Sequence, residues 1–544
     1  MKKRRSLTFL GLTSLLVFGS ATTFKSDHGK FFEISKNIEI YTNLYKEVNT
    51  HYVDDLDPAQ LMRTGVDAML ASLDPYTNYI SETEIEGFRY ITEGRYNGIG
   101  AKFDVIDGLV TITEPYEGSP AIKAGLKAGD QIIEVDGKDV TKRDEEELST
   151  ILKGYPGTEV RLKVRRPGTA KPLDLALTRD EVQVPNVPYS GMISDKVGYV
   201  ALTTFTRDAG RNVAAAVKKL KDEHPEMTGM VFDLRGNGGG LLTEAVNVSN
   251  VWIPKGELVV TTKGKVKDRD RSFKTLNNPV DENMPLVVLI NDGSASASEI
   301  VSGVLQDYDR GVLLGQRSYG KGLVQNTRDV GYNSKVKLTI AKYYIPSGRC
   351  IQSIDYQQGE PADVPDSERA KFKTRNGRVV LDGGGVKPDV VVDKDAESDV
   401  LEQLQDEFLI FDYVTQFALK NESIGEVKDF NFTDWDGFVA YLDGRDFDFN
   451  TESEKLLAQL REAVKADGYP VSNELKQVEQ TIINAKKNDL NKYKDVIIDL
   501  IEKEIASRYY YQDGKIQMGL RNDQEIVDAI ELLNDPAKYQ ALLK

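Results

Sequence analysis

Cysteine and histidine are nearly absent from this sequence, which has one cysteine and three histidines among its 544 residues. Cys350 has no intrachain partner, so no intrachain disulfide stabilises the fold, and we expect this side chain to be a small buried apolar group. His28, His51 and His224 lie far along the chain from the serine motif described below. A Ser-His-Asp triad is therefore possible only if folding brings one of them close, and the sequence does not favour it. No cluster of histidine, cysteine and carboxylate residues has metal-ligand spacing. We therefore expect neither a metal nor a cofactor.

The chain also has no surplus of basic residues. Its formal net charge is −16 and its isoelectric point is about 5.0, whereas a nucleic-acid-binding protein presents a basic face to phosphates. The glycine motifs of nucleotide sites are missing as well, because no G-x-x-x-x-G-K-[ST] occurs and no G-x-G-x-x-G opens a helix. These absences argue against a nucleic acid or a nucleotide as the ligand.

Long apolar runs are absent apart from one near the N-terminus. Residues 1–23 read MKKRRSLTFLGLTSLLVFGSATT, with four basic residues before an apolar stretch from Leu7 to about Phe18. Small residues suited to cleavage follow. This layout is typical of a secretory signal peptide, so we expect residues 1–21 to direct export. An uncleaved membrane anchor is the alternative, although the stretch is short for a membrane span.

The length suggests roughly three or four domains, and hydrophobic periodicity divides the remaining chain into four segments. Residues 22–95 carry apolar residues at helical spacing, and residues 96–180 alternate as short strands with one or two helices. Residues 181–395 alternate strands with helices, which predicts a mostly parallel sheet covered by helices. Residues 396–544 are charged and helix-rich. The N-terminal helices could pair with those of a second subunit, but packing within one subunit explains the same pattern.

Three motifs rich in glycine or serine lie in the 181–395 segment. The first is DLRGNGGGLL, residues 233–242, which follows a predicted strand. Glycines in this place let backbone N–H groups approach a phosphate or an oxyanion. A plain tight turn is the alternative. Ligands of such sheets bind at the carboxyl ends of the strands, where this motif lies.

The second motif is NDGSASASEIVSG, residues 291–303, in which serines alternate just before an apolar helix. Ser296-x-x-Glu299 fits a capping box, in which the serine only begins the helix. A serine at a helix N-terminus also lies beside the positive end of the helix dipole, where a developing oxyanion is stabilised. On these residues alone a cap and a nucleophile both remain open.

The third motif is RSYGKGLVQ, residues 317–325, in which Lys321 lies between two glycines and Gln325 follows four residues later. A lysine acts as a general base only when neutral, and burial lowers its pKa toward the working pH. An exposed lysine in a glycine turn is the alternative. Ser318-x-x-Lys321 also matches the S-x-x-K of penicillin-recognising enzymes, but here it does not start a helix and the chain has no K-T-G.

The order of these motifs resembles that of the carboxyl-terminal processing, or tail-specific, serine proteases over about residues 60–395. LDPYT resembles the N-terminal signature of that family, and YNGIGAKF, GSPAIKAGLKAGDQIIEVDG and TEVRLKVRR resemble its inserted PDZ domain. DLRGNGGGLL, GSASASEI, GQRSYGKGLVQ and YYIPSGRCIQ resemble successive blocks of its protease core. RGNGGG and RSYGKG vary slightly from commoner family spellings, and neither removes a functional position.

The resemblance implies a role for each motif of the core. Ser296 would be the nucleophile, Lys321 the general base, and Gln325 the residue that orients and hydrogen-bonds the lysine amine. The oxyanion hole would be formed by the backbone N–H of Ala297 together with that of Gly239 or Gly240.

The predicted PDZ domain implies how the substrate is recognised. PDZ domains add an extended peptide as a strand and capture its C-terminal carboxylate on backbone N–H groups. The resemblance assigns this carboxylate loop to Gly98, Ile99, Gly100 and Ala101, with a β-turn inside a packed strand pair as the alternative. Ile99 and Phe103 would suit an apolar last side chain of the substrate.

We therefore predict a multidomain α/β protein with an N-terminal helical segment, a PDZ-like β module, a mostly parallel ClpP/crotonase-like protease core and a helical C-terminal extension. The resemblance implies a serine endopeptidase, and the predicted signal peptide places it in the bacterial periplasm or cell envelope. It would bind protein C-termini and cleave through an acyl-enzyme. The rival hypothesis is a catalytically inactive PDZ adaptor. A hydrolase of small acyl compounds is a third, although a small substrate needs no module that binds C-termini.

Overall fold

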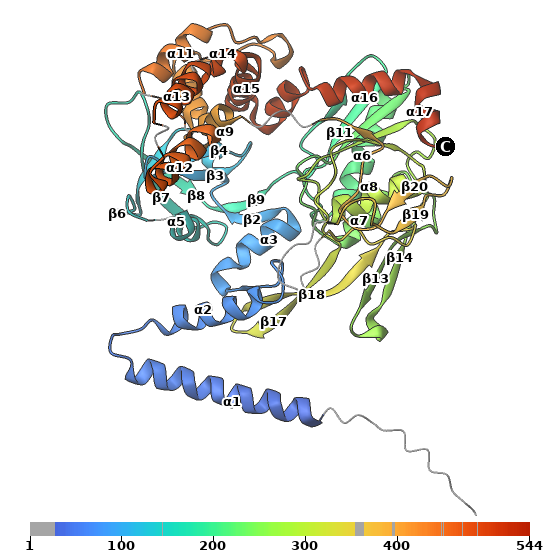
Figure 1. Cartoon of the computed structure of the whole chain (residues 1–544), viewed down its shortest axis with the longest axis horizontal. Coiled ribbons are helices and arrows are strands. Elements are labelled where there is room, and N and C mark those ends of the chain that lie inside the picture. Colours follow the sequence, from blue (N-terminus) through green and yellow to red (C-terminus); the bar gives the residue numbers. More distant parts are fainter. Residues whose placement is uncertain are drawn as a thin grey trace, which may run out of the picture. The chain divides into compact units, whose positions relative to one another are not determined.

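The computed structural model describes residues 28–143, 145–353, 364–393, 398–445, 447, 449, 451–469, 472–486 and 488–544. The predicted signal peptide therefore lies outside the described residues. The chain forms two compact units, residues 1–69 and residues 70–544, and Figure 1 shows its ribbon coloured along the sequence. Among the described helices, none combines the length and the apolar character needed to cross a membrane.

The first unit contains helices at the positions that the helical periodicity predicts. Helix α1 spans His28–His51, and α2 spans Pro58–Ala71. The Tyr45 hydroxyl donates a hydrogen bond to the carbonyl oxygen of Pro58, which joins the start of α2 to α1. Large apolar side chains of α1 are exposed, among them Phe31, Phe32, Ile34, Ile38 and Leu44. Pairing of these helices with a second subunit stays a prediction.

A small antiparallel module lies early in the second unit. Helix α3 (Ile85–Glu93) leads into β2 (Arg95–Gly98), which pairs with β9 (Asp180–Gln183). Between these strands an antiparallel sheet contains β3 (Ala101–Ile106), β4 (Leu109–Pro115), β5 (Gln131–Val135), β6 (Lys138–Asp139), β7 (Glu159–Arg165) and β8 (Leu173–Thr178). In β7 every second side chain is buried, so one face of the strand turns inward with α4 (Pro120–Lys123) and α5 (Glu145–Leu152).

A mostly parallel sheet forms the centre of the α/β region. Its strands are β10 (Ser190–Met192), β11 (Val197–Ala201), β12 (Gly229–Asp233), β15 (Leu286–Ile290), β16 (Val312–Gly315) and β21 (Val390–Val391), in that spatial order. Only the β10–β11 pair is antiparallel among the pairs of this sheet in the described residues. The alternation of strands and helices predicted such a sheet. Its assignment as ClpP/crotonase-like stays a prediction.

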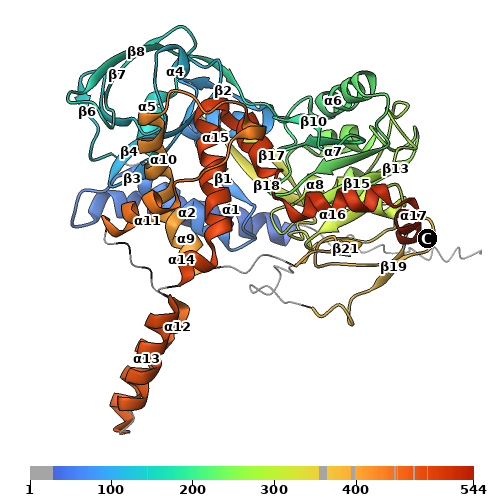
Figure 2. The ribbon, with the colours of Figure 1, turned by 90° about the horizontal axis from the view of Figure 1, so that it is seen from above.

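Successive side chains of β15 contribute to two different cores. Leu286, Val288 and Ile290 pack on one face of the sheet, where the helices are α6 (Ala209–Glu223), α7 (Leu242–Ser249) and α8 (Ala297–Asp307). Val287 and Leu289 pack on the other face with α16 (Gln524–Asn534) and α17 (Pro536–Leu542). Burial on both faces explains the continuous apolar run of this strand. The last two helices of the predicted C-terminal extension therefore cover the second face of the core sheet (Figure 2).

A second sheet supplies the strands that border the site described below. It contains β1 (Asn78–Ile80), β13 (Leu258–Gly264), β14 (Arg271–Lys274), β17 (Leu323–Gly331) and β18 (Ser334–Tyr344). Strand β18 pairs with β1, β13 and β17. The LDPYT motif therefore leads into a strand beside β18. A short hairpin of β19 (Lys371–Lys373) and β20 (Val379–Leu381) lies outside this sheet.

The C-terminal segment is helical, as its composition predicts. Its remaining helices are α9 (Asp399–Asp406), α10 (Leu409–Lys420), α11 (Trp435–Asp443), α12 (Glu452–Asp467), α13 (Ser472–Lys486), α14 (Asp489–Lys492) and α15 (Lys494–Gly519). Val414, Phe438 and Ile501 are fully buried in a core to which α9, α10, α11 and α15 contribute. Helices α12 and α13 pack against each other and are joined by the ion pair between Arg461 and Glu479 at 2.6 Å.

Cys350 is half-buried rather than buried, so that prediction was wrong. Its chain neighbours Arg349 and Ile351 are 1% and 0% exposed and take the inward positions. The side chain between them therefore points partly outward. Burial of the part that is covered still raises the pKa of the thiol.

Candidate active site

A single cavity of about 480 Å³ is lined by all six residues that the resemblance assigns to the chemistry. They come from the segments that follow β12, β15 and β16. Because the carboxyl ends of parallel strands meet at one edge of a sheet, these three segments converge there. The six residues are Gly239, Gly240, Ser296, Ala297, Lys321 and Gln325.

Ser296 lies between the end of β15 and the first residue of α8. Its backbone angles are φ 55° and ψ −108°, a conformation that non-glycine residues rarely adopt and that costs about 1–3 kcal/mol. Helix α8 is buried along its whole length, and this packing holds the strained turn in place. The side chain of Ser296 lines the cavity beside the positive end of the helix dipole.

The two neighbouring serines of the motif have structural contacts instead. The Ser294 hydroxyl donates to the carbonyl oxygen of Leu234 at 2.8 Å, and the Ser298 hydroxyl donates to that of Asn237 at 2.7 Å. Both serines are 0% exposed. These bonds tie the turn just before α8, here called the serine turn, to DLRGNGGGLL, here called the glycine motif. Of the three alternating serines, Ser296 is the one that faces the cavity.

The glycine motif approaches the start of α8 closely. A Cβ atom on Gly239 would lie 2.7 Å from the carbonyl oxygen of Ala295 and 2.9 Å from the N atom of Ala297, and its φ is +99°. Only glycine fits this position. The Gly239 N–H donates to Asn237 Oδ1 at 2.9 Å. Pairing with Phe205 uses the carbonyl of Gly239 and the N–H of Leu241, so neither contact involves the Gly240 N–H.

The Lys321 side chain is largely enclosed, and burial lowers the pKa of its amine. The positive charge of Lys337, which lines the same cavity from β18, lowers this pKa further, whereas Glu299 and Asp74 raise it. The Nζ atom lies 4.3 Å from the ring centroid of Tyr76, in the LDPYT motif. Lys321 is therefore not the exposed lysine of the alternative hypothesis.

Gln325 lines the cavity, but its amide nitrogen donates to Thr339 Oγ1 at 3.1 Å. The Thr339 hydroxyl donates in turn to Asp74 Oδ1 at 3.2 Å. Within the described residues the predicted bond between Gln325 and the Lys321 amine is not formed. The Oε1 atom of Gln325 is the one that can accept from a lysine. The Asp74 of LDPYT thus supports the side chain of Gln325 through Thr339.

The Glu299 side chain makes more contacts than the capping box predicts. Its Oε2 atom accepts from the N–H groups of both Ser296 and Lys321, at 2.7 and 2.8 Å. Its Oε1 atom accepts from the Ser318 hydroxyl and the Gly320 N–H, at 2.6 and 2.7 Å. The side chain is 0% exposed, and burial raises the pKa of its carboxyl while these four hydrogen bonds oppose that shift.

Tyr343 makes a second link between the same two residues. Its hydroxyl lies 2.7 Å from the carbonyl oxygen of Lys321 and 3.1 Å from that of Ser296, and it donates toward both. Glu299 thus binds the N–H groups of Ser296 and Lys321, and Tyr343 binds their carbonyls. The backbones that carry the two candidate catalytic side chains are joined on both sides.

A second cavity of about 350 Å³ lies in the antiparallel module, beside the predicted carboxylate loop. Ile99, Ala101 and Phe103 line it together with Tyr90, Tyr96, Tyr116, Leu152 and Lys153. Gly98 and Gly100 are not among the lining residues. Burial raises the pKa of Tyr96, and hydrogen bonds from the backbone of Ala101 and Gly100 oppose the shift. A bound carboxylate would have to compete with the Tyr96 hydroxyl for this backbone.

Three segments of the chain match known protein families. Residues 196–359 match peptidase family S41, and residues 111–166 match the PDZ domain. Residues 400–533 match a family described as the C-terminal helical domain of a probable PDZ-protease.

Curated relatives share most of their own length with this chain. The carboxy-terminal-processing protease of Bartonella bacilliformis is 35% identical over 360 residues, which are 66% of this chain and 81% of that protein. The carboxy-terminal processing protease CtpA of Bacillus subtilis is 31% identical over 386 residues, 68% of this chain and 80% of that protein. The solved structure of a photosystem II D1 C-terminal processing protease is 28% identical, covers 65% of this chain and 92% of its own, and has a TM-score of 0.36.

The fold and the matched segments define a PDZ-containing serine protease of peptidase family S41. Within that class the chain belongs to the carboxy-terminal processing proteases. The family resemblance deduced from the order of the motifs is therefore confirmed.

We expect Glu299→Gln to lower the free energy of unfolding by about 2 kcal/mol or more, because glutamine would turn a donating NH₂ group toward groups that themselves donate. Proteolytic activity should fall as well, since the same bonds hold the backbones of Ser296 and Lys321. Urea unfolding and the rate of cleavage of an unfolded protein measure the two effects. Glu223→Gln, at the exposed end of α6, is the control and should change neither. Wild-type stability and activity in Glu299→Gln would contradict the role of this carboxylate.

Proposed function

We propose that this chain is an exported endopeptidase that cleaves by a Ser-Lys mechanism and recognises its substrates by their C-termini. The observation that carries the proposal is the convergence of Ser296, Lys321 and the glycine motif on one cavity. The rival hypothesis of an inactive adaptor explains neither this convergence nor the lowered pKa of Lys321.

In the proposed mechanism the neutral amine of Lys321 takes the proton of the Ser296 hydroxyl as the oxygen attacks the scissile carbonyl carbon. The resulting oxyanion accepts hydrogen bonds from the N–H of Ala297 and that of Gly240, with Gly239 as the alternative donor. Lys321 then gives its proton to the leaving amine. A water molecule, deprotonated by the same lysine, hydrolyses the acyl-enzyme and frees Ser296. Gln325 orients the lysine through its Oε1 atom.

Lysine suits this role only where its charged form is disfavoured. Burial is the main cause of the lowered pKa of Lys321, and the charge of Lys337 adds to it. Lys337 is itself half-buried on β18, and burial lowers its pKa too. We therefore assign Lys337 the role of keeping a fraction of Lys321 neutral at the working pH.

Recognition of C-termini is assigned to the module that contains the PDZ match. Its cavity is lined mainly by apolar and aromatic side chains, which suits an apolar last residue of a peptide. Lys153 lines the same cavity, and its side chain would add a positive charge near the terminal carboxylate. The backbone of Gly98 to Ala101 would bind that carboxylate once the Tyr96 hydroxyl has moved aside.

The domain boundaries and the location of the protein are also proposals. We keep residues 22–95, 96–180, 181–395 and 396–544 as the four segments of the mature chain. Export to the bacterial periplasm or envelope is supported by the basic, apolar and small residues of positions 1–21. The exposed apolar side chains of α1 support a homodimer formed through the N-terminal helices.

Ser296→Ala should lower the rate of cleavage by about a thousandfold or more, because it removes the hydroxyl at the start of α8 that would form the acyl-enzyme. Ser294→Ala and Ser298→Ala should keep measurable activity and lose about 1–3 kcal/mol of stability, since each removes a buried hydrogen bond. Mass spectrometry of a fluorophosphonate adduct locates the nucleophile. An adduct on Ser294 or Ser318, with none on Ser296, would overturn the assignment.

The rate of cleavage should rise with pH as the Lys321 ammonium loses its proton. Lys337→Met removes a neighbouring positive charge, so the pKa of Lys321 should increase and the rising limb should move to higher pH. Lys342→Met, at an exposed position of the same strand, is the matched control and should leave the limb in place.

Lys321→Arg should be as inactive as Lys321→Ala, because a guanidinium does not deprotonate. High activity in Lys321→Arg, or a limb that moves equally in both methionine variants, would rule out this account.

A peptide with a free C-terminus should bind the full-length Ser296→Ala protein about tenfold or more tightly than the same peptide with an amidated end. A charge-assisted hydrogen bond to the carboxylate contributes roughly 1.5–3 kcal/mol, which corresponds to that factor. Fluorescence anisotropy measures both affinities without cleavage. Phe103→Glu should weaken binding, whereas Val105→Glu, on the same strand but exposed and outside the cavity, should not. Equal affinity for the two peptides would leave the module without its proposed role.

A further inference from the structure

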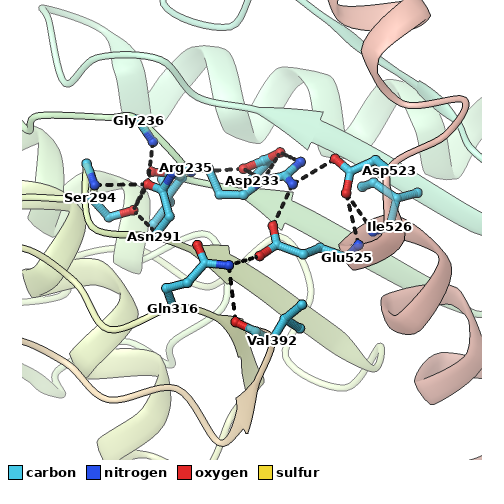
Figure 3. Close-up of polar contacts among 12 residues, drawn as sticks. Asp233, Arg235, Gly236, Asn291, Ser294, Gln316, Val392, Asp523, Glu525 and Ile526 are labelled. Atoms are coloured by element: carbon cyan, nitrogen blue, oxygen red, sulfur yellow. Dashed lines mark hydrogen bonds and ion pairs between the residues drawn. The ribbon is translucent and has the colours of Figure 1, made fainter. Parts of the chain in front are cut away.

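The start of α16 lies against the carboxyl ends of the core strands (Figure 3). Asp523 caps this helix, and its carboxylate accepts from the N–H groups of Glu525 and Ile526 at 2.9 and 3.3 Å. The side chain of Glu525 is 8% exposed and points from the helix toward the core (Figure 3). Its two carboxylate oxygens contact two different segments of the protease core.

The first contact reaches the glycine motif. Glu525 Oε2 lies 2.6 Å from Nη1 of Arg235, and Asp523 Oδ2 lies 2.7 Å from the same atom. The other side of the Arg235 guanidinium binds Asp233, with 2.6 Å between Nη2 and Oδ2. The Tyr199 hydroxyl donates to that same oxygen of Asp233 at 2.8 Å. Arg235 is therefore held between the end of β12 and the start of α16.

The second contact reaches the residue just before the lysine motif RSYGKGLVQ. Glu525 Oε1 accepts from Nε2 of Gln316 at 2.6 Å. Gln316 directly follows β16, and its own N–H donates to the carbonyl oxygen of Ile290 at 3.0 Å. Its Nε2 atom also lies 3.3 Å from the carbonyl oxygen of Val392. Gln316 is thus placed at the base of the segment that leads to Lys321.

The glycine motif is joined in turn to the serine turn. The Gly236 N–H, next in the chain after Arg235, donates to Asn291 Oδ1 at 2.8 Å. The Asn291 N–H donates to the Ser294 hydroxyl at 3.0 Å. One network therefore connects Glu525 with all three segments that line the catalytic cavity (Figure 3).

Apolar contacts also hold α16 against the core sheet. Ile526, Ala529, Leu532 and Leu533 of the helix are buried against the second face of the core sheet, with Tyr539 of α17. Burial of these apolar side chains stabilises the docked helix without the polar contacts. A substitution that keeps the size of Glu525 should therefore leave the helix in place and alter only the polar contacts.

We propose that Glu525 is a positioning residue of the active site, which sets the distance between the oxyanion side of the cavity, through Arg235, and the lysine side, through Gln316. Under this proposal α16 contributes to the geometry of the active site, and α17 packs with it on the protease core. This inference rests on the proposed Ser-Lys function of that cavity. It assigns to the last segment of the chain a role in the geometry of catalysis.

The test compares Glu525→Gln with wild type in the full-length protein. Glutamine at position 525 loses the charge that pairs with Arg235, and its NH₂ group would face a donor in either orientation of the amide, namely Gln316 Nε2 or Arg235 Nη1. We expect kcat on an unfolded protein substrate to fall about tenfold or more, with KM within about twofold. The thermal midpoint should fall by a few degrees, because a buried carboxylate is lost, while the protein stays folded. Glu531→Gln, exposed on the same helix, is the matched control and should behave as wild type.

A second variant separates positioning from folding. In Gln316→Glu with Glu525→Gln, the donor and the acceptor exchange places, so the bond between the two side chains is restored. Recovery of at least a third of the lost kcat supports the proposal. A folded double variant that stays as slow as Glu525→Gln overturns it, and so does a Glu525→Gln enzyme with wild-type kcat. Where Glu525→Gln fails to fold, Gln316→Met replaces it, and wild-type kcat in that variant overturns the proposal.

Labelling with a fluorophosphonate keeps this inference distinct from the proposed function. If the wild-type protein acquires no adduct on Ser296, the proposed function fails and the inference with it. If Ser296 of the wild-type protein reacts and Ser296 of Glu525→Gln reacts at the same rate, only the inference about Glu525 fails. Slower labelling of Ser296 in Glu525→Gln, with a wild-type rate in Glu531→Gln, supports both.

Discussion

The carboxylate of Glu299 is the contact on which the geometry of the cavity depends. A fully buried carboxylate is costly unless hydrogen bonds surround it, and here four donors do so. Three of them come from residues 318–321 and one from Ser296, so the serine turn and the lysine segment must adopt their conformations together. The strained backbone of Ser296 persists because α8 is packed on all sides and Glu299 receives its N–H.

Helices on both faces of the parallel sheet contribute contacts at the carboxyl ends of its strands. Helices α6, α7 and α8 cover one face, and α8 begins directly after Ser296. Helices α16 and α17 cover the other face. The contacts of Arg235 and Gln316 with Glu525 span about two to three hundred positions of the chain. The protease core is therefore complete only when the C-terminal helices have docked. This explains why a segment without chemical motifs of its own is part of the fold.

Helix α3 lines both cavities. Gly87 and Tyr90, three residues apart, line the cavity of the antiparallel module, while Phe88, Ile91 and Thr92 line the catalytic cavity. Residues three and four apart share one face of a helix, so the two faces of α3 serve two sites. The predicted site of peptide capture and the predicted site of cleavage are thus separated by a single helix.

The amino-acid sequence by itself determined the strand and helix alternation, the capping pair of Ser296 and Glu299, and the order of motifs that identifies the family. Each of these depends on residues close together in the chain, where periodicity and spacing carry the information. Only the tertiary structure decided that Glu299 also binds the lysine segment, that Gln325 donates to Thr339, and that the N–H of Gly239 is used by Asn237. It alone assigned α16 to the second face of the sheet. These contacts join residues brought together by sheet pairing and packing, and no local pattern specifies which distant donor meets which acceptor.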